Sequence, residues 1–81
     1  MTNKVKYDQI FVECFSVESS ALGDSFEYQS VPAWDSVGHM GMIAAIEESF
    51  GIMMDMDDII DFGSYSKGKE LLKKYGIEID A

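Results

Sequence analysis

The chain has 81 residues and a mass of 9.1 kDa, enough for one domain with a small core. Its 15 acidic and 6 basic residues give a net charge of −9 and a pI near 4.2. All the bases are lysines near the two ends, and residues 7–66 contain twelve acids but no lysine. Such a surface disfavours binding to nucleic-acid phosphates or anionic membranes and favours basic patches on other proteins.

Several further classes are disfavoured by the residues present. The one cysteine, Cys14, allows no internal disulfide and no cysteine-pair zinc site. The acidic stretch around Asp57 does not fit a calcium loop, because Ile59 and Ile60 occupy positions that need an oxygen ligand and a glycine. The polar N-terminus lacks a signal-peptide core, and no run reaches the roughly 18 apolar residues of a membrane span. We therefore expect a soluble, cytoplasmic protein without a metal.

The first expected element is a helix over about residues 3–17, with Asn3 as its N-cap. Apolar residues recur there at mostly helical spacing, with polar residues between them. The residues expected on its apolar face are Val5, Ile10, Phe11, Cys14 and Phe15. Residues 18–34 are expected to form a loop, because serine, glycine and proline signals fill this segment. Its expected anchors in the core are Leu22, Phe26 and Tyr28.

The second helix is expected from Asp35 or Ser36 to about residue 50, where Gly51 stops it. Its apolar stripe consists of Met40, Ile43, Ile46 and Phe50. A short apolar connection over 52–56, one or two helical turns over 57–62 and a helix from about 64 or 66 to 75 follow. The predicted fold is all-α: one domain over residues 1–81, a small bundle of three to four helices with a long first loop.

Asp35 and Ser36 form the sharpest local feature, at the junction of the long loop and the second helix. A serine there exposes its hydroxyl at the positive end of a helix, where a phosphate ester is electrostatically favoured. Both residue types are also ordinary N-caps. Taken alone, the pair is therefore explained more simply by capping.

The wider pattern resembles the acyl carrier proteins. Asp35-Ser36-Val37 is followed ten residues on by Glu47-Glu48-Ser49-Phe50-Gly51-Ile52. The family pattern is Asp-Ser-Leu at a helix start and Glu-Glu-x-Phe-Gly-Ile at a similar distance. Length, acidity and the order of the expected elements correspond over the whole chain. The resemblance implies that Ser36 carries a covalent 4′-phosphopantetheine, whose thiol holds acyl groups as thioesters. It also implies that Asp35 helps a phosphopantetheinyl transferase to recognise the site.

The resemblance further implies that the protein is a carrier and not an enzyme. It would be a phosphoprotein that serves fatty acid or other lipid biosynthesis, or a specialised pathway. It would present acyl intermediates, as a monomer, to loading and transferring enzymes. Those enzymes would dock through basic patches, since charge complementarity favours fast association without tight binding. The expected docking residues are Glu47, Glu48, Asp55, Asp57, Asp58 and Asp61.

Three residues depart from the pattern of fatty-acid carriers. Gly38 and Gly41 stand where acids are common, and two glycines are expected to soften the start of the helix. Trp34 stands where small residues are common. Residues 34–40 read Trp-Asp-Ser-Val-Gly-His-Met. This run is similar to the corresponding run in stand-alone carriers of polysaccharide or secondary-metabolite pathways.

Some alternatives stay open at the level of sequence. His39 either lines the site beside Ser36, on a neighbouring part of the helical face, or is a partly exposed histidine without a special task. The methionines concentrated in residues 40–56 either form an adaptable acyl cavity or fill the core. An aminoacyl or peptidyl carrier and an unmodified acidic interaction module are alternatives to the acyl carrier. An independent enzyme is disfavoured, because no third group orients a base next to Ser36 and His39.

Overall fold

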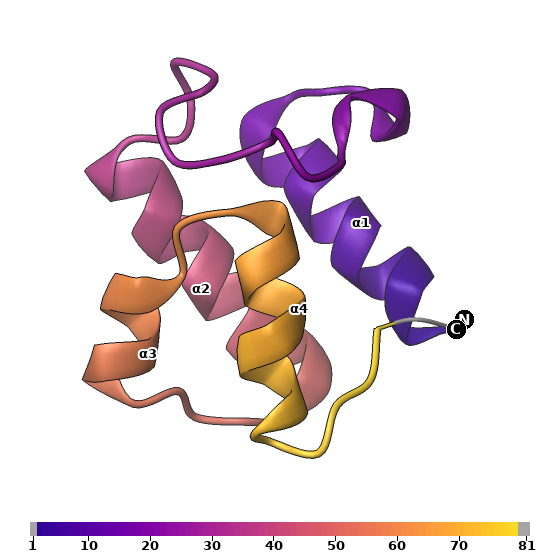
Figure 1. Ribbon diagram of the computed structural model, residues 1–81, viewed down its shortest axis with the longest axis vertical. Helices are drawn as coiled ribbons and strands as arrows, with labels where there is room; N and C mark the ends of the chain where they lie inside the picture. The colour runs from indigo at the N-terminus through magenta and orange to yellow at the C-terminus, as the bar shows by residue number, and fades with distance from the viewer. Residues whose placement is uncertain (1, 80–81) are drawn as a thin grey trace.

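The computed structural model describes residues 2–79, which form four α-helices and one 3-10 helix and contain no strand. The elements are α1 (Asn3–Phe15), η1 (Ser19–Ala21), α2 (Ser36–Phe50), α3 (Met56–Asp61) and α4 (Tyr65–Lys73). Figure 1 shows the connection between α1 and α2 passing over one end of the helices, with α3 and α4 on the side towards the viewer. The prediction of a small all-α bundle with a long first loop is confirmed.

The start and end of α1 differ from the prediction by a few residues. The Thr2 hydroxyl accepts a hydrogen bond from the Val5 N–H at 3.2 Å, so Thr2 is the N-cap and the assignment of Asn3 to that position is wrong. Asn3 is the first helical residue. The helix ends at residue 15, earlier than expected, because Ser16 adopts a left-handed conformation with φ of 54°.

The starts of α2 and α4 are also set by side-chain caps. An Asp35 carboxylate oxygen accepts from the Gly38 N–H at 2.8 Å, and the Ser64 hydroxyl accepts from the Lys67 N–H at 3.0 Å. At the other end of α2, Gly51 is left-handed with φ of 65°, as expected of a helix stop. The caps therefore place Ser36 as the first residue of α2, directly after the capping carboxylate.

The centre of the core is aromatic. Trp34 is fully buried, and its ring stacks on Phe15 at 5.0 Å between centroids, while Phe11 meets Trp34 edge-on at 5.6 Å. The buried aromatic side chains are Tyr7, Phe11, Phe15, Phe26, Trp34, Phe62 and Tyr65. Because Trp34 immediately precedes the Asp35 cap, this aromatic cluster fixes the position at which the loop ends and α2 begins.

Three residues of the predicted apolar stripes and loop anchors are exposed. Val5 and Met40 are 45% and 53% exposed, and Tyr28 is 38% exposed. Tyr7 and Met42, which the predicted stripes omitted, are fully buried. Apolar spacing alone does not decide which of two neighbouring residues on a helix faces the core. The packing of α1 on α2 decides this. Met40 is turned away from the core and lines a surface pocket together with Ser36.

The long loop is tied to the junction of α3 and α4. Phe26 is buried and Leu22 packs against the core, as predicted. The Phe26 carbonyl accepts from the Tyr65 N–H at 2.9 Å, and the Tyr28 N–H donates to the Gly63 carbonyl at 2.8 Å. These bonds hold the part of the loop that passes closest to the start of α2.

The two glycines of α2 have different surroundings. A Cβ on Gly38 would lie 2.0 Å from the Ala33 carbonyl oxygen, so only glycine permits this close approach of the loop to the first helical turn. A Cβ on Gly41 would have no neighbouring atom within 4 Å. Gly38 is therefore required by packing, a role that its place in the sequence did not indicate.

Candidate functional site

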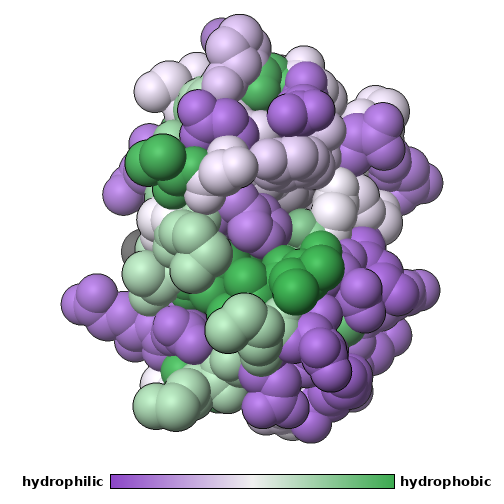
Figure 2. Space-filling model, turned by 90° about the vertical axis from the view of Figure 1, so that its left-hand side faces the viewer, coloured by the Kyte–Doolittle hydropathy of each residue, from purple (hydrophilic) through white to green (hydrophobic). Residues whose placement is uncertain are grey.

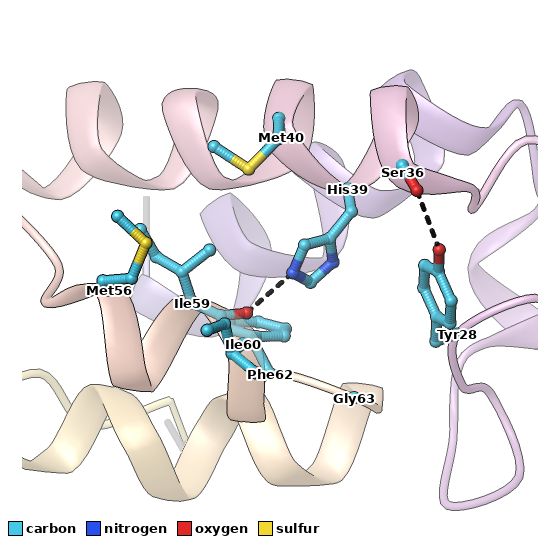
Figure 3. A pocket seen from close by; sticks show the side chains of 9 residues that line it. All are labelled: Tyr28, Ser36, His39, Met40, Met56, Ile59, Ile60, Phe62 and Gly63. Atoms are coloured by element: carbon cyan, nitrogen blue, oxygen red, sulfur yellow. Dashed lines mark hydrogen bonds between the residues drawn. The ribbon is translucent and has the colours of Figure 1, made fainter.

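Ser36 is exposed at the start of α2, and its hydroxyl oxygen lies 3.3 Å from the Tyr28 hydroxyl oxygen. Asp35 precedes it in extended conformation and is also exposed. Figure 3 shows Tyr28 reaching from the loop towards Ser36. The predicted pair thus lies at the surface, where the serine side chain is accessible to solvent. Tyr28 was expected to anchor the loop in the core and not to line this site, because loop spacing gives no signal of which side chain returns to the helix.

A pocket of about 380 Å³ opens beside Ser36, between α2 and the segment that contains α3. Its walls are mostly apolar, and no carboxylate or ammonium group is among the side chains that line it. The lining residues are Tyr28, Ser36, His39, Met40, Met56, Ile59, Ile60, Phe62 and Gly63. The pocket has the size and character of a site for part of a small apolar ligand.

His39 links three segments at the inner wall of this pocket. The Trp34 indole N–H donates to His39 Nδ1 at 3.0 Å, and His39 Nε2 lies 2.8 Å from the Ile59 carbonyl oxygen. Because a carbonyl only accepts, these partners assign the proton of a neutral imidazole to Nε2. His39 therefore lines the site, but it also has a structural task. Neither ring nitrogen is free to bind a phosphate.

The outer edge of the pocket continues into an exposed apolar patch. This patch consists of Val37, Met40, Met56 and Ile60, which are between 53% and 82% exposed. Figure 2 shows apolar side chains gathered on this face, with hydrophilic ones beside them. An exposed apolar patch of this kind is typical of a surface that binds another protein.

The predicted docking acids divide into two groups. Glu48, Asp55, Asp57 and Asp61 are exposed. Glu47 is half-buried, and its carboxylate accepts from the Met54 N–H at 2.9 Å. Asp58 is only 3% exposed, so its assignment as a docking residue is wrong. Its position on α3 points the carboxylate towards α4 instead of towards solvent.

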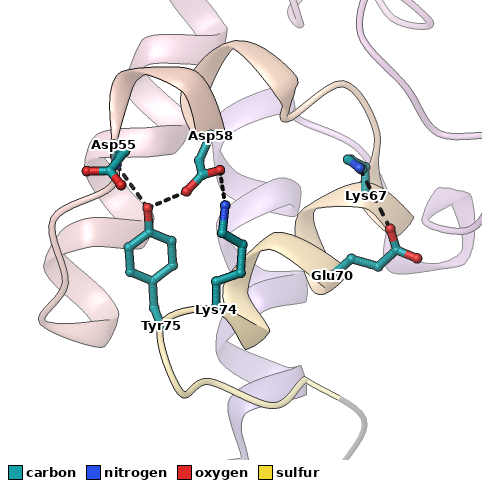
Figure 4. A network of polar contacts seen from close by, with 6 residues as sticks. All are labelled: Asp55, Asp58, Lys67, Glu70, Lys74 and Tyr75. Carbon is teal, nitrogen blue, oxygen red and sulfur yellow. Dashed lines mark hydrogen bonds and ion pairs between the residues drawn. The ribbon is translucent and has the colours of Figure 1, made fainter.

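Asp58 connects α3 to the end of α4, as Figure 4 shows. Its carboxylate accepts from Lys74 Nζ at 2.6 Å and from the Tyr75 hydroxyl at 2.5 Å, while Tyr75 also accepts from the Asp55 N–H at 2.9 Å. The bonds from Lys74 and then Tyr75 hold the pKa of Asp58 below its ordinary value. The same contact raises the pKa of Lys74. This network fixes the helix that forms one wall of the pocket.

The Asp58 network predicts a loss of stability at acid pH. A carboxyl with a lowered folded-state pKa stabilises the fold above its unfolded pKa of about 3.9, and this contribution disappears as pH falls through the folded value. Asp58→Asn is expected to lower the thermal midpoint at neutral pH and to make it less sensitive to pH below about 4. Thermal unfolding followed by circular dichroism at several pH values measures both effects.

Asp57→Asn is the matched control, because Asp57 is an exposed neighbour on the same helix. Its stability should stay within about 0.5 kcal/mol of wild type. An Asp58→Asn variant with the full stability and acid sensitivity of wild type would contradict the role given to the network.

None of the helices in residues 2–79 has the length and apolar character needed to cross a membrane. No group of three or more histidine, cysteine, aspartate or glutamate side chains in that range is arranged to hold a metal ion.

Comparisons with protein-family models and with curated proteins gave no match.

Proposed function

We propose that the protein is an acyl carrier and that Ser36 is the attachment site of 4′-phosphopantetheine. The observation that carries the proposal is the position of this serine. Ser36 belongs to the Asp-Ser motif, is exposed at the first residue of α2, and lies at the edge of an apolar pocket. These are the properties that a covalently attached carrier arm requires.

The residues around Ser36 fit the group. A phosphodiester there would lie at the positive end of α2, with the Tyr28 hydroxyl within reach as a hydrogen-bond donor. In the attachment reaction, the Ser36 oxygen forms a bond to the pantetheine phosphorus of coenzyme A. The pyrophosphate P–O bond breaks, adenosine 3′,5′-bisphosphate leaves, and a base of the transferase takes the serine proton. The attached group supplies a thiol that carries acyl chains as thioesters.

The pocket favours an acyl over an aminoacyl cargo. Met40, Met56 and Ile60 form its outer wall, and none of the lining residues is a carboxylate that would pair with an ammonium group. A charged amine placed there would lose hydration without a compensating ion pair. An alkyl chain would instead replace water against apolar side chains.

A specialised pathway is favoured over general fatty acid synthesis. Any side chain at Gly38 would collide with the Ala33 carbonyl, so the acid common at this place in fatty-acid carriers is incompatible with this loop. The loop itself is held by the buried Trp34. The first turn of α2 therefore offers a partner an apolar surface around Val37, in place of an acidic one.

The direct test is the intact mass of the purified wild-type protein after incubation with a phosphopantetheinyl transferase and coenzyme A. We expect a gain of one phosphopantetheine group. A protein that stays unmodified with several transferases would contradict the proposal and would favour the unmodified interaction module. Loading the modified protein with an alkanoyl and with an aminoacyl group then compares the cargoes. We expect the alkanoyl group alone to shift the NMR signals of Met40 and Met56.

The exposed acids predict that association with the transferase depends on salt. Raising the salt concentration from about 0.01 M to about 1 M shortens the Debye length from about 30 Å to about 3 Å. We expect the rate of modification at low protein concentration to fall about tenfold or more over this range. Glu48→Gln with Asp57→Asn should lower the rate at low salt and reduce its salt dependence. A rate that is independent of salt would exclude electrostatic steering by these acids.

A further inference from the structure

The hydroxyl of Tyr28 is a polar group that lines the pocket and lies against the side chain of Ser36. Ser36 and His39 are the other lining residues with polar side chains, and both His39 nitrogens already have partners. The Tyr28 hydroxyl lies 3.3 Å from Ser36 Oγ and is directed at the residue that we propose is modified.

Tyr28 is held firmly by its backbone and by its ring. Its N–H donates to the Gly63 carbonyl at 2.8 Å, and the next residue, Gln29, donates to the Trp34 carbonyl at 3.0 Å with a left-handed φ of 66°. The Tyr28 ring meets Trp34 edge-on at 6.5 Å and His39 edge-on at 5.9 Å. The tertiary structure thus presents a phenol at a defined place beside an exposed serine.

We propose that Tyr28 is a positioning residue for Ser36. Before modification its hydroxyl holds Ser36 Oγ in one rotamer, and after modification it donates a hydrogen bond to a phosphodiester oxygen. The inference rests on the proposed attachment of phosphopantetheine, and it adds a second residue to the site on a different segment of the chain. A phosphodiester oxygen only accepts, so the phenol must donate in the modified protein. Because Tyr28 is 38% exposed, water competes for this hydrogen bond. Loss of the bond is therefore expected to change the rate of modification only modestly.

The test uses Tyr28→Phe, which keeps the ring and removes the hydroxyl. In the unmodified protein, Hα–Hβ couplings should show one Ser36 rotamer in wild type and an average of rotamers in the variant. The kcat of modification should fall about two- to tenfold, which corresponds to the loss of one net hydrogen bond, while KM stays unchanged. The ³¹P chemical shift of the modified variant should also differ from that of modified wild type.

Asp57→Asn is the contrasting variant, because Asp57 is exposed on α3 and does not line the pocket beside Ser36. It should raise KM and leave the Ser36 couplings and the ³¹P shift as in wild type. Equal couplings, kcat and ³¹P shift in Tyr28→Phe and wild type would overturn the role of Tyr28 while leaving the carrier function intact. If wild type itself gains no pantetheine, the carrier function fails and the phosphate contact fails with it. The two failures are therefore distinguishable.

Discussion

Ser36→Ala is expected to lose all pantetheine attachment, while its free energy of unfolding stays within about 0.5 kcal/mol of wild type. The hydroxyl is the proposed nucleophile, and alanine offers no atom in its place. The fold loses little, because Ser36 is exposed and the Asp35 carboxylate, not Ser36, caps α2. Intact mass after incubation with transferase and coenzyme A measures attachment, and urea denaturation measures stability.

Ser49→Ala is the matched control, since Ser49 is an exposed serine near the other end of the same helix. This variant should be modified at the wild-type rate. An adduct on Ser36→Ala would show that another residue is the attachment site. The proposed assignment of Ser36 would then be wrong even if the protein is a carrier.

Gly68→Ala is expected to destabilise the protein by about 2 kcal/mol net, since overpacking by roughly 3 kcal/mol outweighs a helix-propensity gain of roughly 1 kcal/mol. A Cβ on Gly68 would lie 2.1 Å from Phe62 Cζ and 2.2 Å from the Tyr7 hydroxyl oxygen. Both side chains are fully buried and cannot move aside without disturbing the aromatic core. Tyr7 also donates to the Tyr65 carbonyl at 2.6 Å, so its displacement would break a buried hydrogen bond.

Gly41→Ala tests the same substitution where space is open. No atom lies within 4 Å of a Cβ at that position, so alanine should stabilise α2 by about 1 kcal/mol through helix propensity alone. In a domain of this size, the two substitutions should move the thermal midpoint in opposite directions, by about 4–8 °C for each kcal/mol. A stability gain in Gly68→Ala would mean that α4 does not pack on Tyr7 and Phe62 as described.

Much of the helical architecture could be read from local patterns. Apolar spacing located α1, α2 and α4, and Gly51 marked the end of α2, because periodicity and stop signals depend only on near neighbours. The Asp35-Ser36 junction was also placed correctly at the start of a helix. The choice of buried face was less certain. Met40 belongs to the predicted apolar stripe of α2, but it is exposed and lines the pocket, which is one of the two roles left open for the methionines.

The sequence by itself therefore determined the helix positions, the acidic charge and the candidate serine, all of which are properties of composition or of local spacing. Only the tertiary structure decided which distant side chains meet. It buried Asp58 against Lys74, used His39 to join α2 to α3, and brought Tyr28 to the hydroxyl of Ser36. Such contacts depend on how the loop and the helices pack together. Contacts between elements distant in the chain carry no fixed spacing from which they could have been predicted.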